Sequence, residues 1–193
     1  SYVYKIADQP NVELLVSFSD ITNDGFTVTQ VLNDRTTLES RWTCTEEGLI
    51  STEYANLQFA ARGYDMSTLG YTGVQLPLPA EMMADNTWSS QFDVEATYEN
   101  EFGTGEVAMI ITESTLVLGQ INVTVPAGDY TDALQTETDN NYEITTLEAG
   151  EPTGTFTVNG TTSTWYVQDL GIVRQEILSQ GVSIVIELLE IQQ

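Results

Sequence analysis

Apolar residues recur at every second position along much of this 193-residue chain. Residues 12–18 place Val, Leu, Val and Phe at the even positions, and residues 92–98 alternate Phe, Val, Ala and Tyr with acidic residues or Thr. Successive side chains of a β-strand point to opposite faces, so this spacing predicts strands with one buried face. No long run combines helical periodicity with capping residues. We therefore expect an all-β fold with at most short helical turns.

The length and the density of these strands predict a single antiparallel β domain over residues 1–193. About a dozen short strands joined by short turns fit one large antiparallel sheet that is curved enough to hide its edges. Pro77 and Pro79 favour an extended connection over residues 71–80, which leads to a short helical turn near residues 80–84. A curved half-barrel, a closed barrel and a two-sheet sandwich all remain open at this point.

The pair Asn159-Gly160 stands between two alternating runs and is the clearest hairpin signal, because both residues tolerate the positive φ of a tight turn. A two-residue loop there would bring Phe156 and Trp165 within diagonal reach on one face. Further turns are predicted at residues 22–25, 46–48, 100–105 and 139–141, where Gly, Asn and Asp gather.

The charge is strongly one-sided, with 29 acidic residues against five basic ones and a formal net charge of −24. A negative field repels phosphate, so no nucleic-acid partner is expected, and it also disfavours anionic membrane surfaces. It favours solubility, cationic partners or divalent ions. An acidic surface that keeps an exported protein soluble is the simplest interpretation.

No catalytic residue and no cofactor is predicted. The chain has no histidine, so a serine triad lacks its base, and its one cysteine, Cys44, is expected to be a small buried side chain. Zinc lacks its usual ligands. The acidic turns around Asp20 and Asp129 do not have the spacing of an EF-hand loop, so no metal site is predicted. We expect that the protein is not an enzyme.

Two segments of the C-terminal half occur in a recognisable order. Residues 123–133 read Val-Thr-Val-Pro-Ala-Gly-Asp-Tyr-Thr-Asp-Ala, and residues 164–174 read Thr-Trp-Tyr-Val-Gln-Asp-Leu-Gly-Ile-Val-Arg. This Val-Pro-Ala-Gly corner and the later Trp-Tyr…Gly-Ile-Val-Arg pair resemble the bacterial exported family that includes TapB-type proteins and the DUF3108 group. Weaker matches are Cys44 with Gly48-Leu49, and Pro77-Leu78-Pro79 ahead of residues 85–88.

The resemblance implies a bacterial envelope or secreted protein, often a lipoprotein, with a sheet similar to the open, curved half-barrels of lipoprotein carriers. It carries no established enzymatic activity. The expected location is extracytoplasmic: periplasm, cell surface or medium, with a lipid anchor on an N-terminal segment that has been removed as one option. The most apolar stretch, residues 184–189, is far too short to span a bilayer, and no transmembrane segment is expected.

A curled sheet with an apolar inner face must be filled by side chains or by a ligand. The candidate ligand-lining residues are Trp42, Phe59, Trp88, Phe92, Met109 and Trp165, and the alternative is that they form the core. We therefore expect a non-catalytic binding or interaction domain whose partner is a lipid or another apolar small molecule. The alternatives are a structural or adhesive domain that binds another envelope protein, and a glycan hydrolase with paired carboxylates. Glu95, Glu99 and Glu101 alternate along one strand and are more simply a solvated face.

Overall fold

In the computed structural model, which describes residues 1–7, 9–100 and 103–192, most of the chain is β-strand. The strands are β1 (Tyr2–Ile6), β2 (Gln9–Ser19), β3 (Gly25–Leu32), β4 (Thr36–Cys44), β5 (Gly48–Ser51), β6 (Tyr64–Gly73), β7 (Leu76–Pro77), β8 (Thr87–Asn100), β9 (Gly103–Val125), β10 (Gly128–Glu148), β11 (Glu151–Val167), β12 (Gly171–Ser179) and β13 (Val182–Ile191). The helical segments of the described residues are α1 (Leu57–Ala61) and the 3-10 turn η1 (Pro79–Glu81). Neither of them is long and apolar enough to cross a membrane.

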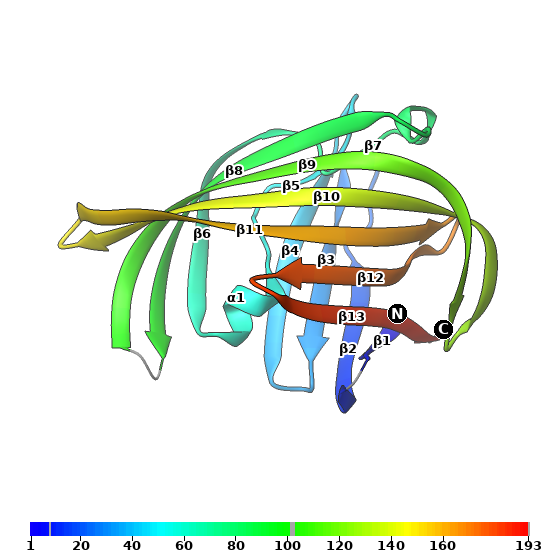
Figure 1. Ribbon diagram of the computed structural model, residues 1–193, viewed down its shortest axis with the longest axis horizontal. Coiled ribbons are helices and arrows are strands. Elements are labelled where there is room, and N and C mark those ends of the chain that lie inside the picture. Colours follow the sequence, from blue (N-terminus) through cyan, green and yellow to red (C-terminus); the bar gives the residue numbers. More distant parts are fainter. Residues whose placement is uncertain (8, 101–102, 193) are drawn as a thin grey trace.

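All of these strands belong to one antiparallel sheet in the order β6-β8-β9-β10-β11-β12-β13-β1-β2-β3-β4-β5-β7. The sheet bends back on itself, so that β8 to β13 lie over β1 to β5, as Figure 1 shows. It ends on β6 at one side and on β7 at the other, without a pairing between them in the described chain. The expected all-β fold with a single curved sheet is confirmed, and among the three architectures left open the half-barrel is the one observed.

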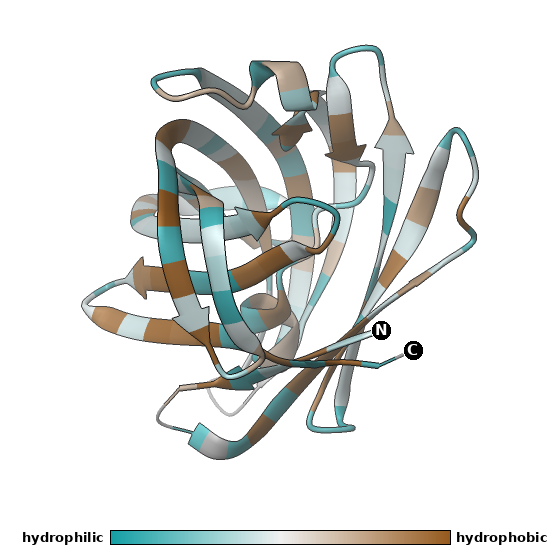
Figure 2. Ribbon diagram, turned by 90° about the vertical axis from the view of Figure 1, so that its right-hand side faces the viewer, coloured by the Kyte–Doolittle hydropathy of each residue, from teal (hydrophilic) through white to brown (hydrophobic). Residues whose placement is uncertain are grey.

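Period-two alternation holds along the strands, as the alternating apolar and polar bands of Figure 2 show. On β8 the residues Phe92, Val94 and Ala96 are buried, whereas Asp93 and Glu95 between them are exposed. The longest strands, β9 and β10, have 23 and 21 residues, and their ladder shifts register between Gln135 and Thr136. A bulge of this kind lets a long strand bend while its neighbours stay paired.

The hairpin predicted at Asn159-Gly160 is wrong. Both residues lie inside β11, where Asn159 pairs with Asn141 and Gly160 pairs with Asn140 on β10 and with Ser179 on β12. The turn predicted at residues 139–141 is wrong for the same reason, since these residues lie inside β10. Pairing on both sides outweighs the local turn preference of Asn and Gly. Phe156 and Trp165 therefore share one strand and do not face each other across a hairpin.

The β10–β11 turn is instead formed by Ala149 and Gly150, whose φ angles are 50° and 82°. Gln180 and Gly181 join β12 to β13 with φ angles of 51° and 79°. Positive φ at both central residues matches the right-handed twist of the strands that such turns connect. The turns predicted at residues 22–25 and 46–48 are confirmed, with Thr22 N donating to Gly25 O and Thr45 N donating to Gly48 O. The tip of the turn predicted at residues 100–105 lies outside the described residues.

The connection between β6 and β8 is extended, as expected, and contains β7 and then η1. The short helix α1 begins where Asn56 accepts hydrogen bonds from the backbone N–H groups of Gln58 and Phe59 through its side chain. This cap satisfies donors that the helix itself leaves unpaired. The cap fixes the place where the chain leaves β5 and turns toward β6.

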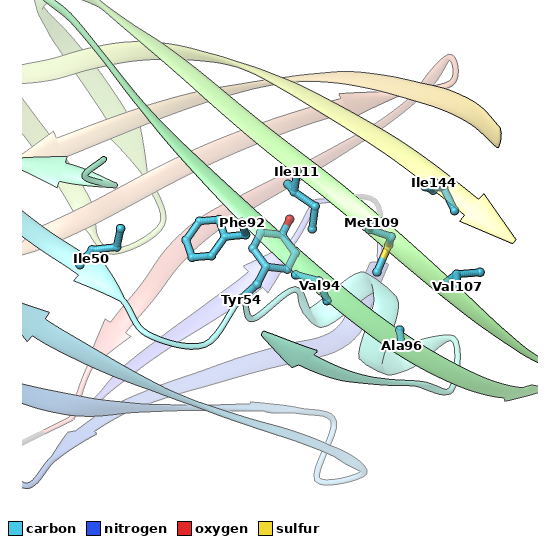
Figure 3. Close-up of a cluster of buried hydrophobic side chains, with 9 residues drawn as sticks. All are labelled: Ile50, Tyr54, Phe92, Val94, Ala96, Val107, Met109, Ile111 and Ile144. Atoms are coloured by element: carbon cyan, nitrogen blue, oxygen red, sulfur yellow. The ribbon is translucent and has the colours of Figure 1, made fainter. Parts of the chain in front are cut away.

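Two apolar clusters fill the space between the layers. The first, drawn in Figure 3, joins Ile50 and Tyr54 to the inner face of β8, β9 and β10; its buried members are Ile50, Tyr54, Phe92, Val94, Ala96, Val107, Met109, Ile111 and Ile144. The second joins the far ends of β9 and β10 to β1, β2 and β11 to β13; its buried members are Tyr4, Leu14, Val123, Val125, Ala133, Trp165, Val173 and Leu188. Burial on this scale is the main stabilising contribution to the fold.

Candidate binding groove

The two ends of the sheet are tied together at one point and separate at another. The segment between β6 and β7 makes the tie: Val74 N donates to Ser89 O on β8, and Gln75 N donates to Leu49 O on β5. Trp88 supports it, because its Nε1 donates to Gln75 O at 3.1 Å. These hydrogen bonds therefore link the two ends of the open sheet at the point where β6 ends and where β4 meets β5.

Away from this tie, β4 and β6 each present an edge without a paired strand in the described chain. β5 pairs with β4 only over residues 42–44, so residues 36–40 of β4 pair with β3 alone within the described chain. Among the described residues, the backbone of β6 pairs with β8 alone over residues 64–73, and Tyr54 N donates to the side chain of Thr68 at 2.7 Å. The helix α1 contacts both β4 and β6, and Figure 1 shows it between them. An open seam therefore runs between two strand edges, and the backbone N–H and C=O groups of each edge can pair with another strand.

A groove of about 640 Å³ occupies this seam. Its walls come from the start of β4, from α1 and the residues before it, and from the start of β6; the lining residues are Arg35, Thr36, Thr37, Leu38, Glu39, Glu53, Tyr54, Ala60, Tyr64, Asp65, Met66, Ser67 and Thr68. Tyr54 is buried, whereas Arg35, Glu39, Glu53 and Asp65 are exposed. The groove thus has an aromatic base and a charged rim with three carboxylates and one guanidinium.

The groove borders a set of polar side chains that begins at Tyr54 of the first apolar cluster. The Tyr54 hydroxyl lies 3.2 Å from that of Tyr142. The Glu113 carboxylate accepts hydrogen bonds from Ser90 Oγ at 2.9 Å and from Gln75 Nε2 at 3.2 Å. Gln75 in turn accepts a bond from Ser51 N on β5. The network therefore joins β8 and β9 to the segment that ties the seam.

Burial dominates the electrostatics of these groups. Desolvation raises the pKa of the Glu113 carboxyl, and the donors from Ser90 and Gln75 lower it in part. Desolvation raises the pKa of Tyr166 to about 12, with hydrogen bonds to Thr164 and Thr136 acting the other way. Burial likewise raises the pKa of Tyr54 well above its ordinary value. These tyrosines stay neutral at physiological pH and act as hydrogen-bonding groups.

The predicted ligand-lining residues lie in four separate surroundings. Phe92 and Met109 belong to the first cluster and Phe59 packs against it, while Trp165 belongs to the second. Trp42 stacks on Phe26, and Trp88 donates to Gln75 O. None of the six lines the seam groove, or a second groove of about 490 Å³ over β1 to β3. Their contact with a ligand stays a prediction.

The structure also places the other candidate residues. Cys44 is exposed at the end of β4, so the expectation of a buried side chain is wrong. Glu95 and Glu99 lie exposed on β8, and Glu101 lies outside the described residues. Across the described ranges, 1–7, 9–100 and 103–192, no three His, Cys, Asp or Glu side chains come together as a metal site.

Sequence reasoning missed Glu113, Ser90 and Gln75. The alternation itself contains the signal for Glu113, because Met109 and Ile111 face the interior and residue 113 is next in that register. The groove residues have no such signal. They become neighbours only because the two ends of the sheet curve toward each other.

A solved structure shares this architecture. It is a crystal structure described as "a putative lipoprotein from Parabacteroides distasonis ATCC 8503", with a TM-score of 0.57 and 15% sequence identity over 99% of this chain and 94% of that one. At this identity the similarity concerns the fold. The chain matches no family model and no curated protein sequence, so its resemblance to the TapB and DUF3108 family stays a prediction.

Proposed function

We propose that this chain is a non-catalytic, envelope-associated domain that binds another protein along the open seam between β4 and β6. The observation that carries the proposal is that two unpaired strand edges border one groove within the described chain. Strand edges are common templates for protein association, because their backbone groups bind any partner in extended conformation. The lack of histidine supports a role without catalysis.

The envelope location is supported by the fold shared with the protein described as a lipoprotein and by the family motifs of residues 123–133 and 164–174. A protein partner is favoured over an apolar small molecule, because Phe92 and Met109 are buried in the core and pack against other side chains. The groove that is open to solvent has a charged rim instead, with Glu39, Glu53 and Asp65. Charged rims are typical of protein interfaces.

Site-specific photocrosslinking in the native host tests the proposal. A photoreactive amino acid replaces Thr37 or Ser67, which are exposed and line the groove, and in the matched controls it replaces Thr157 or Thr131, which are exposed elsewhere. The expected result is one adduct of defined mass from both groove positions and none from the controls, with the same partner identified by mass spectrometry. Equal adducts from all four positions, or none from any, would contradict a protein-binding seam.

A further inference from the structure

The edge of β6 has neither of the two residue types that most often block strand pairing, proline and lysine. Over Tyr64–Gly73 it contains neither Pro nor Lys, and its one charged residue is Asp65. The opposite end of the sheet is different, since β7 has two residues and one of them is Pro77. Short strands, prolines and lysines are the common means of blocking an edge. β6 is therefore the better template of the two sheet ends over residues 64–67, before Thr68 Oγ1 accepts a hydrogen bond from Tyr54 N and the strand bulges between Thr68 and Gly70.

The side chains of β6 define two faces for any strand that is added beside it. Tyr64 and Met66 are half-buried and pack against the first apolar cluster. Asp65 and Ser67 alternate with them and are exposed. Side chains of neighbouring strands that lie opposite each other share a face. An added strand would therefore place alternate residues beside Tyr64 and Met66, where apolar groups fit, and the others beside Asp65.

The negative charge of the groove favours positively charged residues at the positions of the added strand that lie beside Asp65. Glu39, Glu53 and Asp65 line the rim and Arg35 is the only basic lining residue. The whole chain adds a formal charge of −24, which repels acidic peptides and also a second copy of the same chain. Complementary charge accelerates association and excludes partners of the wrong sign.

From these observations we propose that the seam binds an extended segment of a partner protein in which apolar and basic residues alternate, and that this segment pairs with the free edge of β6. The inference rests on the proposed function and specifies the chemistry of the partner. The segment pairs through its backbone along residues 64–67, inserts apolar side chains over Tyr64 and Met66, and directs Lys or Arg toward Asp65, Glu39 and Glu53.

Fluorescence anisotropy with synthetic peptides tests this. The probe is a labelled peptide of alternating Val and Lys, about ten residues long, which is the length of a longer natural strand. Two comparison peptides replace every Lys by Glu, or carry the Val-Lys sequence with N-methylated backbone amides. Saturable binding of the Val-Lys peptide alone is expected. Equal binding of the N-methylated peptide would show attraction by charge without strand pairing and would overturn the proposal, as would binding of the Val-Glu peptide.

Charge neutralisation locates the binding site. The variant Glu39→Gln, Glu53→Gln, Asp65→Asn should weaken binding about tenfold, since each exposed ion pair contributes only a fraction of 1 kcal/mol. The matched control Asp132→Asn, Glu137→Gln, Asp139→Asn removes the same charge from exposed positions on β10, which is not adjacent to β6, and should change affinity much less. Equal losses in both variants would place the peptide outside the seam.

Crosslinking and peptide binding together distinguish a failure of the basic-strand proposal from a failure of the protein-binding function on which it rests. Specific crosslinks from Thr37 and Ser67 without peptide binding would leave a protein-binding seam and reject the basic strand. Sedimentation that shows a dimer, lost when the rim of the groove is neutralised, would make a second copy the occupant and would also reject it. Far-UV circular dichroism and thermal melting confirm that each variant is folded before binding is measured.

Discussion

The buried hydroxyl of Ser90 donates a hydrogen bond of 2.9 Å to the carboxylate of Glu113 across the β8–β9 pair. Buried carboxylates need such donors, because water no longer solvates the charge. The predicted effect of Ser90→Ala is a loss of about 2 kcal/mol in the free energy of unfolding at neutral pH. The loss should shrink below about pH 4, where the carboxyl is protonated. Urea denaturation at both pH values measures it, and an equal loss at both would count against the role of the charge.

Glu113 also determines in which direction the free energy of unfolding changes with pH. Its pKa is raised in the folded protein, mainly by desolvation, so the native state holds the proton more tightly than the unfolded chain does. Its contribution to the free energy of unfolding is therefore greatest below the unfolded pKa of about 4.3 and is lost as pH rises through the folded pKa. Glu113→Gln should flatten this slope between acidic and neutral pH. Glu106→Gln, exposed on the same strand, is the control, and a wild-type slope in Glu113→Gln would refute the assignment.

The β10–β11 turn can be improved by one substitution. Ala149 has a φ of 50°, which costs an alanine roughly 1 kcal/mol and suits asparagine better. Ala149→Asn should therefore raise the free energy of unfolding by about 0.5 to 1 kcal/mol. Thermal unfolding provides the measurement, with Thr157→Asn at an exposed position of β11 as the control. A neutral result for Ala149→Asn would argue against the observed turn.

The pairing of β5 with β7 depends on the absence of a side chain at residue 48. A Cβ at Gly48, whose φ is 146°, would lie 2.3 Å from the backbone oxygen of Leu76, whereas at Gly128, with a φ of 149°, it would meet nothing within 4 Å. Gly48→Ala should destabilise the protein by about 2 to 4 kcal/mol and Gly128→Ala by clearly less. Urea denaturation compares the two variants, and equal losses would mean that the φ angle, and not the contact, is what matters.

Arg174 joins two glutamates to an aromatic ring. Its Nη1 donates to Glu187 at 2.8 Å, its guanidinium also pairs with Glu176, and its central carbon lies 5.4 Å from the centre of the Trp165 ring. Lysine keeps the charge but loses the planar fork and much of the ring contact. Arg174→Lys should lower the free energy of unfolding by about 1 to 2 kcal/mol. The exposed Arg62→Lys is the control, and a loss that differs little between the two would contradict this.

Alternation predicted the strands well, because the physical rule is local: a half-buried strand needs apolar residues on one face whatever it pairs with. The inward residues Phe92, Val94 and Ala96 could be assigned in this way. Turn prediction failed at Asn159-Gly160, because the choice between turn and strand depends on neighbours that are distant in sequence. Asn141 and Ser179 supply those neighbours, and the local preference of Asn-Gly is too weak to compete with two ladders.

The candidate site shows even more clearly which features follow from the sequence and which depend on the tertiary structure. The sequence by itself determined the all-β class, the half-buried strands, the net negative charge and the lack of histidine, since each follows from residue type or from short-range spacing. Only the tertiary structure decided that the ends of β4 and β6 border one groove, because that depends on the accumulated twist and bend of the whole sheet. Asp65 and Glu39 line the same groove because of that curvature, which no short window of sequence encodes.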